Sequence, residues 1–244
     1  DAGLVVIWDA SAGYADGQIR ELDRIVAHSD QVGQVRFEPN GYRLLSVGYD
    51  GKAKIWDAQT GDLVKAYDSP GRNWGSAWSQ DGKKFATGAD RGTARVYDFS
   101  TPDRDAPLFE VDSRSELAMG VAFNPAADRL AVAPVKEGIQ IYDIGNADIA
   151  LQSEAPIAPE QIDEVGEGEL FSVEWSRDGR LLASGLDNGD MLVWSAEGEQ
   201  VELARMNNVQ AARGLSFRSD NAYLATGSDA GEARVWSLLM IMSV

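Results

Sequence analysis

The chain has 244 residues, of which 44 % are hydrophobic and 25 % charged, a composition ordinary for a soluble globular protein. Its formal net charge of -17 argues against non-specific binding to nucleic acid or to an anionic membrane, because both depend on Lys and Arg. The chain has no cysteine, which excludes disulfides, thiolate metal sites and a cysteine nucleophile.

The strong acidity of the chain has two readings. It can steer a basic protein or peptide towards the chain, or it can serve only solubility. No apolar run approaches the roughly 18 residues that a membrane helix needs, and no basic stretch precedes an apolar one at the N-terminus. We therefore expect a cytoplasmic protein with no membrane or nucleic-acid partner, no cofactor and no bound metal.

In chain order, the first elements are two strands of an incomplete unit. Residues 4–8 form an apolar run that ends in Trp8, and a second strand is expected near residues 19–27. Residues 1–3 are typical of a hairpin tip, and the two strands that should precede such a tip are missing. We therefore predict that this unit is completed by strands from elsewhere.

Two aromatic landmarks then recur along the rest of the chain, and the members of each pair are 19 residues apart. Each landmark ends an apolar run. The pairs are Phe37 and Trp56, Trp78 and Tyr97, Phe123 and Tyr142, Trp175 and Trp194, and Phe217 and Trp236. A repeat period of roughly 40 residues indicates stacked supersecondary units and not one irregular domain.

The fourth of these units shows its secondary structure most clearly. Residues 171–175 alternate between apolar and polar, as a strand with one buried face does. Three further short strands are expected at residues 181–184, 191–194 and 200–204, with turns rich in Gly, Asp and Asn between them. Four antiparallel strands make a small sheet that must bury both faces against neighbours, and radial stacking of such sheets produces a β-propeller.

The aromatic residue that ends each third strand carries a family signature. It occurs as Trp8-Asp9, Trp56-Asp57, Tyr97-Asp98, Tyr142-Asp143, Trp194-Ser195 and Trp236-Ser237, so the last two lack the Asp. With these residues at this period, the chain resembles the WD-repeat (tryptophan–aspartate repeat) β-propeller family over essentially its whole length. The resemblance implies an all-β fold, a β-propeller of four-stranded antiparallel blades. The chain would supply five complete repeats plus an N-terminal half blade, as part of a larger propeller.

We predict a single propeller domain over residues 1–244. It consists of a half blade at 1–27 and repeats at about 28–68, 69–112, 113–154, 169–205 and 206–244, with an acidic insertion at 155–168. Residues 153–169 around this insertion hold six acids and no Lys or Arg. The insertion either docks a basic partner or is a solvated connection between blades.

The resemblance also implies a structural tetrad, which occurs in full only in the first complete repeat as His28, Ser46, Asp50 and Trp56. In the family the Asp bonds the His, the His bonds the hydroxyl and the hydroxyl bonds the indole N–H. Such a buried chain is favourable only when every member is satisfied. At the position of Asp50 we read Arg91, Glu137, Asn188 and Ala230 in the other repeats. We expect those blades to depend more on packing.

Catalytic motifs are missing from the sequence. The only histidine, His28, is assigned to the tetrad, and the sequence has no Walker loop, no Gly-x-Ser-x-Gly elbow and no EF-hand loop. We therefore predict no catalytic residues and a protein that is not an enzyme. Two alternatives stay open: an enzyme with paired carboxylates at the axial funnel, and a purely structural oligomerisation module.

In WD-repeat propellers, partners usually bind the face formed by the loop into the first strand and by the hairpin tip. The resemblance places on that face Tyr49, Arg72, Trp74, Asp90, Leu117, Met119, Lys136, Phe171, Asp187, Arg213 and Asp229. Arg72, Trp74 and Arg213 are the leading candidates, because aromatic and Arg residues are the usual anchors of interfaces. Met119 and Phe171 could equally extend the core between blades.

Trp74 is expected at the exposed rim, because Gly33 at the same position of the first repeat indicates that the space need not be filled. The leading function is a non-enzymatic scaffold or sensor domain that binds a protein or peptide, possibly a basic one, on this face. The domain could also be fused to, or assembled with, another domain of a longer chain. Rigid propellers suit this role because they supply pre-organised surfaces.

Overall fold

The chain folds into a series of small antiparallel sheets. In the computed structural model the described residues are 3–9, 20–101, 103–113, 115–136, 138–145, 151–154, 168–196, 202–207 and 210–239. Within these ranges all regular structure is β-strand. No segment within them forms a helix that could cross a membrane. The all-β fold predicted from the sequence is therefore confirmed.

The strands group into six sheets in chain order. The first sheet holds β1 (Leu4–Asp9) and β2 (Arg20–Val26), and the second holds β3 (Val32–Phe37), β4 (Arg43–Gly48), β5 (Lys52–Asp57) and β6 (Leu63–Asp68). The third sheet holds β7 (Asn73–Trp78), β8 (Lys84–Ala89), β9 (Thr93–Asp98) and β10 (Phe109–Asp112). The fourth holds β11 (Ala118–Phe123), β12 (Arg129–Pro134), β13 (Gln140–Asp143) and β14 (Leu151–Glu154).

The last two sheets follow the same order. The fifth holds β15 (Leu170–Trp175), β16 (Leu181–Leu186), β17 (Asp190–Ser195) and β18 (Glu202–Asn207), and the sixth holds β19 (Ala212–Phe217), β20 (Tyr223–Ser228) and β21 (Ala233–Ser237). The fourth strand of the fourth repeat lies slightly later than the predicted 200–204. The sixth sheet has three strands among the described residues, and residues 240–244 fall outside them, as do residues 155–167 of the acidic insertion.

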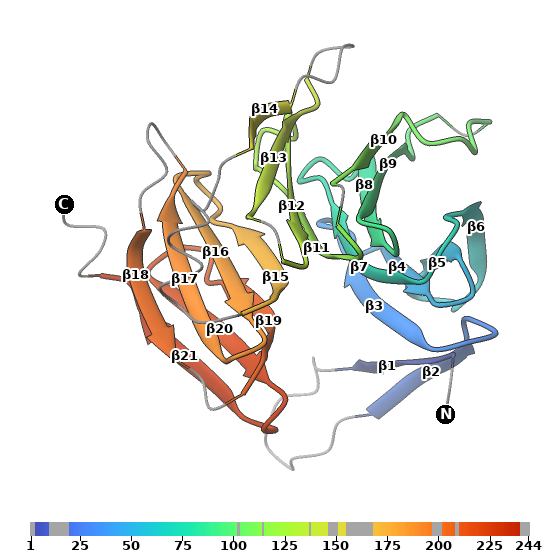
Figure 1. Ribbon diagram of the computed structural model, residues 1–244. Coiled ribbons are helices and arrows are strands. Elements are labelled where there is room, and N and C mark those ends of the chain that lie inside the picture. The colour runs from blue at the N-terminus through green and yellow to red at the C-terminus, as the bar shows by residue number, and fades with distance from the viewer. Residues whose placement is uncertain are drawn as a thin grey trace.

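The sheets lie side by side around a common centre, and the first strand of each complete unit is the innermost (Figure 1). Successive inner strands β3, β7, β11, β15 and β19 contact one another, which makes the sheets blades of a propeller. The two-stranded first sheet is the predicted half blade. The first and sixth sheets are the two ends of this arrangement.

The hydrophobic core consists of separate layers between successive blades. Val121 and Phe123 of β11 pack against Ala86 and Val96 of the third sheet. In the same way Trp175 of β15 packs against the fourth sheet. From the second complete repeat onward, the aromatic that ends the first strand thus packs on the preceding blade, and this explains why it recurs at that position.

In the third and fifth sheets the turn between the first two strands is built from a Ser, an Asp and a Gly. In the fifth sheet the Ser176 hydroxyl donates to Asp178 Oδ1 (2.6 Å), and the same oxygen accepts the Arg180 amide (3.1 Å). Gly179 follows with a φ of 75°, a conformation that favours glycine. This local chemistry fixes the register of the hairpin and thereby the ends of both strands.

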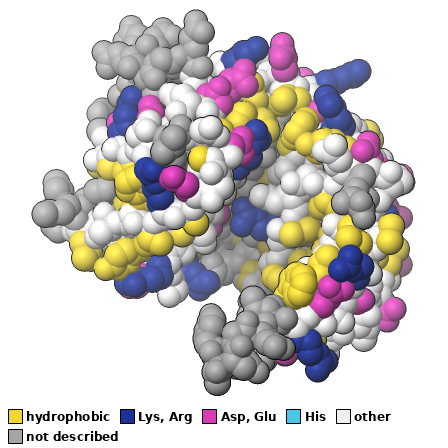
Figure 2. Space-filling model, turned by 90° about the horizontal axis from the view of Figure 1, so that it is seen from below, with side chains coloured by type: hydrophobic (Ala, Val, Ile, Leu, Met, Phe, Trp, Pro, Cys, Tyr) yellow, Lys and Arg dark blue, Asp and Glu magenta, His cyan; other side chains and the backbone are white. Residues whose placement is uncertain are grey.

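Apolar side chains lie exposed on the second sheet, which follows the half blade, and on the sixth sheet, although the equivalent residues of the other blades are buried or, for Trp78, half-buried. Val35 and Phe37 on β3 are 42 % and 57 % exposed, whereas the equivalent Val121 and Phe123 are 4 % and 8 % exposed. At the other end, Val235 on β21 is 70 % exposed. We call the surface formed by Val35, Phe37 and Val235 the open seam. Seen from below, the molecule is hollowed near its middle, with hydrophobic side chains on both sides of the hollow (Figure 2).

Candidate functional site

A repeated backbone hydrogen bond brings two loops of each blade to the same end of the propeller. The residue before the first strand accepts from the amide of the hairpin tip between the second and third strands. The bonds run from Tyr49 to Gln31, Asp90 to Arg72, Val135 to Leu117, Asp187 to Glu169 and Asp229 to Ala211, with donor–acceptor distances of 2.9, 3.1, 3.0, 2.9 and 3.2 Å. We call this end the top face.

Four of the predicted residues form one cluster on the top face, which we call the Trp74 cluster: Tyr49, Arg72, Trp74 and Asp90. The Trp74 indole N–H donates to Asp90 Oδ1 (2.9 Å), and the Arg72 Nε–H donates to Asp90 Oδ2 (3.0 Å). The Tyr49 and Trp74 rings lie 4.6 Å apart between centroids, and the Arg72 guanidinium lies 5.4 Å from the Trp74 centroid. The Trp74 side chain is half-buried and not fully exposed as expected, because Tyr49 and Asp90 hold its ring.

A second group, the Arg213 cluster, joins residues from two blades. Arg213 Nε–H donates to Asp229 Oδ1 (2.6 Å), and its guanidinium lies 4.6 Å from the centroid of the Phe171 ring. Phe171 is on β15 and Arg213 on β19, so the stacking crosses a blade boundary. Phe171 is half-buried, which lets it both extend the core between blades and support the arginine.

The electrostatics of the two clusters are linked through Tyr49. Partial burial raises the pKa of the Tyr49 hydroxyl above its usual value, and the charges of Arg72 and Arg213 only moderate that rise. Burial also acts to raise the pKa of Asp90, but the hydrogen bonds from Trp74 and Arg72 outweigh it and leave that pKa below its usual value. At neutral pH, Tyr49 is therefore a hydrogen-bond donor and Asp90 an anion.

The remaining predicted residues lie on the same end of the propeller but form separate contacts. Leu117 pairs with Asp90 through an isolated β-bridge, and Met119 is half-buried at the start of β11. Lys136 lies within 4 Å of carboxylates of Glu116 and Glu169 (3.7 and 3.9 Å). Asp187 accepts the Glu169 amide (2.7 Å).

The alignment of the third repeat needs a correction of one residue. The hydrogen bond to Leu117 comes from Val135, so Val135 and not Lys136 occupies the hairpin-tip position of Tyr49 and Asp90. Val135 is buried and Lys136 is exposed. Lys136 consequently matches the position of Asp50, which we had assigned to Glu137, a residue outside the described ranges.

The tetrad residues form a continuous hydrogen-bonded chain in the second sheet. His28 Nδ1 lies 2.9 Å from Asp50 Oδ1, and His28 Nε2 lies 2.8 Å from Ser46 Oγ. The Trp56 indole N–H donates to Ser46 Oγ (2.9 Å). Burial lowers the pKa of His28 despite the nearby Asp50 carboxylate, so the ring is neutral, donates from Nδ1 to Asp50 and accepts the Ser46 hydroxyl at Nε2.

Other blades keep the inner half of this chain. Trp194 donates to Ser184 (3.3 Å), and Trp236 donates to Thr226 (3.1 Å). In the third sheet Ser69 replaces His28, and its hydroxyl lies 2.9 Å from that of Thr87. A hydroxyl residue ten positions before the third-strand aromatic is the sequence signal for this bond, and we had not used it.

Replacement of His28 by Ala is expected to lower the free energy of unfolding by about 1–3 kcal/mol, because Asp50 and Ser46 lose their buried partner. The matched control is Ser69→Ala at the equivalent position of the third sheet, where the uncharged hydroxyl bonds to Asn73 Oδ1 (2.7 Å) and Thr87 Oγ1 (2.9 Å) are lost and about 1 kcal/mol is expected. Urea unfolding measures both. A cost for His28→Ala no larger than that of Ser69→Ala would contradict a stabilising role for the tetrad.

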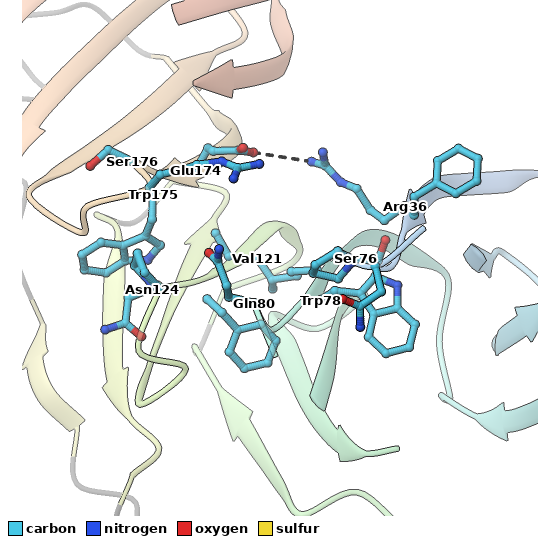
Figure 3. Close-up of a pocket in the computed structure, with 17 residues that line it drawn as sticks. Arg36, Ser76, Trp78, Gln80, Val121, Asn124, Glu174, Trp175 and Ser176 are labelled. Carbon is cyan, nitrogen blue, oxygen red and sulfur yellow. Dashed lines mark ion pairs between the residues drawn. The ribbon is translucent and has the colours of Figure 1, made fainter. Parts of the chain in front are cut away.

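A cavity of about 440 Å³ lies at the opposite end of the inner strands (Figure 3). Arg36 of β3 and Glu174 of β15 reach towards each other across it, with 3.8 Å between Arg36 Nη2 and Glu174 Oε2. Burial raises the pKa of Glu174, and the Arg36 charge offsets this only in part. Glu174 is the only carboxylate among the residues that line the cavity, so a pair of carboxylates for acid–base chemistry is not assembled there. Sequence analysis did not single out Arg36 or Glu174.

Metal ligands are not grouped in the part of the chain that the structure describes. Within those ranges no three His, Asp or Glu residues are close enough together to hold an ion.

Four-stranded blades around a common axis, with a His–Ser–Trp chain in one of them, define a propeller-type repeat protein. The sequence profile of the WD40 family, the WD domain or G-beta repeat, matches residues 19–57, 74–98, 164–195 and 207–237, which is just over half of the chain. The chain belongs to the WD40-repeat family. The third complete repeat is not matched by the profile, yet it folds into the same four-stranded sheet.

Three relatives cover most of the chain at low identity. The WD repeat-containing protein SL1-17 of Schistosoma mansoni is 25 % identical over 195 residues, which is 80 % of this chain and 58 % of that protein. The eukaryotic translation initiation factor 3 subunit I of Drosophila grimshawi is 23 % identical over 88 % of this chain and 66 % of its own length. The WD repeat-containing protein 26 homolog of Arabidopsis thaliana is 23 % identical over 95 % of this chain and 37 % of its own length. The chain thus spans about two thirds or less of these relatives.

Proposed function

We propose that this chain is a non-enzymatic interaction scaffold that binds a segment of a protein partner on its top face. The Trp74 cluster is the observation that carries the proposal. Its aromatic and Arg side chains are held by defined contacts and are still accessible, which is the character of residues that dominate binding energy at interfaces. The Arg213 cluster extends the same surface, and Leu117, Met119, Lys136 and Asp187 would form its rim.

Two further observations support an interaction role. One relative is named as a subunit, and a subunit works inside an assembly of proteins. The axial cavity holds a single carboxylate, which weakens the alternative of an enzyme with paired carboxylates at the funnel. We also propose a cytoplasmic location, as expected from the sequence.

The open seam supports a second part of the proposal, that these blades belong to a larger propeller. In the other blades the positions of Val35 and Phe37 are buried or half-buried against a preceding sheet, so further strands would cover them here too. The inner edge of β1 also has no strand partner among the described residues. The remaining alternative is a purely structural role, in which the open seam would hold a second copy of the chain and the top face would bind nothing.

Affinity capture tests the proposal against a matched control that the chain itself supplies. Tyr223 lies under Arg218 (4.0 Å to the ring centroid), beside the turn at the opposite end of the sixth sheet. Wild type, Trp74→Ala and Tyr223→Ala are immobilised and challenged with a lysate of the organism that makes the protein. We expect at least one protein that wild type and Tyr223→Ala retain equally and that Trp74→Ala retains at least tenfold less.

Thermal unfolding of the three proteins accompanies the capture, because a half-buried Trp contributes to stability as well. We expect Trp74→Ala to stay folded at the capture temperature, with a loss of about 1–2 kcal/mol from its hydrogen bond and ring contacts. If folded Trp74→Ala captures the same proteins in the same amounts as Tyr223→Ala, the top face is not the binding surface.

A further inference from the structure

Four arginines of the outer surface are paired side-on with a carboxylate of their own strand or turn. Arg24, Arg205 and Arg234 each donate from both Nε and Nη2 to a single Glu, and Arg218 does the same to Asp220. In this side-on arrangement the carboxylate takes two of the donors on the guanidinium fork. The Nε–Nη2 edge of these four arginines is therefore taken.

Arg72 and Arg213 on the top face are bound differently. Each donates to its Asp through Nε alone, and within the described residues the Nη groups of both have no hydrogen bond. Their side chains are 54 % and 51 % exposed. The end of the guanidinium fork, which carries most of its N–H donors, is therefore open to a ligand.

The two arginines are also fixed in direction. Arg72 lies over two rings, 5.4 Å from Trp74 and 6.0 Å from Tyr49, and Arg213 lies 4.6 Å from Phe171. A guanidinium that is stacked and bonded at Nε loses little further rotamer freedom when a ligand binds. Long unsupported side chains would lose much more, on the order of 1 kcal/mol each.

The carboxylates of the two clusters are bound to their own arginines. Asp90 Oδ1 accepts from Trp74 and Oδ2 accepts from Arg72, and Asp229 Oδ1 accepts from Arg213. A Lys or Arg of a partner that bound these carboxylates would also approach the open guanidinium ends, and like charges at short distance repel each other. Both guanidinium charges also act on Tyr49, whose hydroxyl stays protonated and remains a donor. The open Nη groups of Arg72 and Arg213 and the Tyr49 hydroxyl are thus hydrogen-bond donors, although the charge of each arginine is balanced by its own Asp.

We propose that the partner segment bound on the top face presents an anionic side chain, a carboxylate or a phosphate, to the open ends of Arg72 and Arg213. The inference rests on the proposed function and names the chemistry of the partner. It reverses the expectation of a basic partner drawn from the net charge of -17. The attraction due to the net charge is long-ranged, and physiological salt screens it beyond about 8 Å. The two arginines, in contrast, would contact the ligand directly. A segment with few anionic groups would meet less repulsion than a long acidic tail, because the rest of the chain is acidic.

Oriented peptide libraries test the charge of the ligand directly. Four libraries with the same degenerate flanks carry Glu, phosphoserine, Gln or Lys at the fixed central position, and each is passed over the immobilised full chain. We expect the Glu or the phosphoserine library to be retained at least tenfold better than the Gln library, and the Lys library to be retained least. The better retained of the two anionic libraries identifies the group as carboxylate or phosphate.

Matched variants assign the effect to the two arginines. Arg72→Gln and Arg213→Gln should each reduce retention of the anionic library at least fivefold, while Arg218→Gln on the opposite end of the sixth sheet should leave it unchanged. Equal retention of the Glu, phosphoserine and Gln libraries, or a preference for Lys, would overturn the inference. Retention that depends on Trp74 but on neither arginine would overturn it while leaving the proposed function intact. The inference would also be overturned, and the proposed function left intact, if no library were retained while affinity capture from the lysate still depended on Trp74.

Discussion

Phe123→Ala is expected to cost about 3–5 kcal/mol of unfolding free energy, whereas Phe37→Ala should cost about 1 kcal/mol or less. The two residues hold the same place in their blades, at the end of the inner strand. Phe123 is packed against the preceding blade and is 8 % exposed, while Phe37 faces the open seam and is 57 % exposed. The difference in unfolding free energy between the two variants therefore measures the packing of the preceding blade against the phenylalanine, because the residue type is the same in both.

Urea unfolding of both variants measures this difference. The same pair also tests whether the chain is part of a larger propeller. In a longer protein that supplies the missing strands, Phe37 would be covered and Phe37→Ala should approach the cost of Phe123→Ala. Equal costs in the present chain would mean that its seam is already closed in solution, contrary to the exposure described above.

Gly75→Ala is expected to destabilise the chain by about 1–3 kcal/mol, because the added methyl group has no space. A Cβ at Gly75 would lie 2.3 Å from the carbonyl oxygen of Met119, which belongs to the inner strand of the next blade. Gly75 and Met119 cannot move apart without separating β7 from β11. The added methyl group therefore weakens the packing of the third sheet against the fourth.

Gly214 is the matched control, three residues before the landmark aromatic as Gly75 is. A Cβ there would meet no heavy atom closer than 3.9 Å, because no further blade packs on that side among the described residues. Gly214→Ala should be neutral or stabilise by up to about 1 kcal/mol, since alanine restricts the unfolded chain. Thermal unfolding separates the two outcomes, and a larger loss for Gly214→Ala than for Gly75→Ala would contradict the packing order of the blades.

The sequence predicted the blades because their signals are local and repeated. The constant spacing between landmarks such as Trp175 and Trp194 places two strands of each sheet, and in two of the repeats a Ser-x-Asp-Gly turn also places the hairpin between the first two strands. The hairpin tip of the third repeat was misplaced by one residue at Lys136. The constant spacing from the first landmark aromatic to the tip, 12 residues from Trp78 to Asp90, already gives Val135 when it is applied to Phe123, and the hydrogen bond from Val135 to Leu117 agrees with it.

The top face was predicted as a set of positions but not as a set of contacts. Arg72 and Asp90 pair because the loop and the hairpin tip of one blade always meet, and this could have been anticipated from the repeat. The stacking of Arg213 on Phe171 joins two blades and has no local sequence signal. The same holds for Arg36 and Glu174, which meet across the axial cavity only because their strands share the centre of the propeller.

Amide hydrogen exchange with and without a captured partner tests the central claim most directly, because it maps the bound surface without any substitution. We expect protection to concentrate at the loops of the top face, near residues 31–33, 49–51, 71–74 and 211–213. The turn near residues 218–222 at the opposite end should exchange equally in both states. Protection confined to that turn or to the open seam, with the Trp74 and Arg213 clusters unaffected, would contradict the proposed binding face.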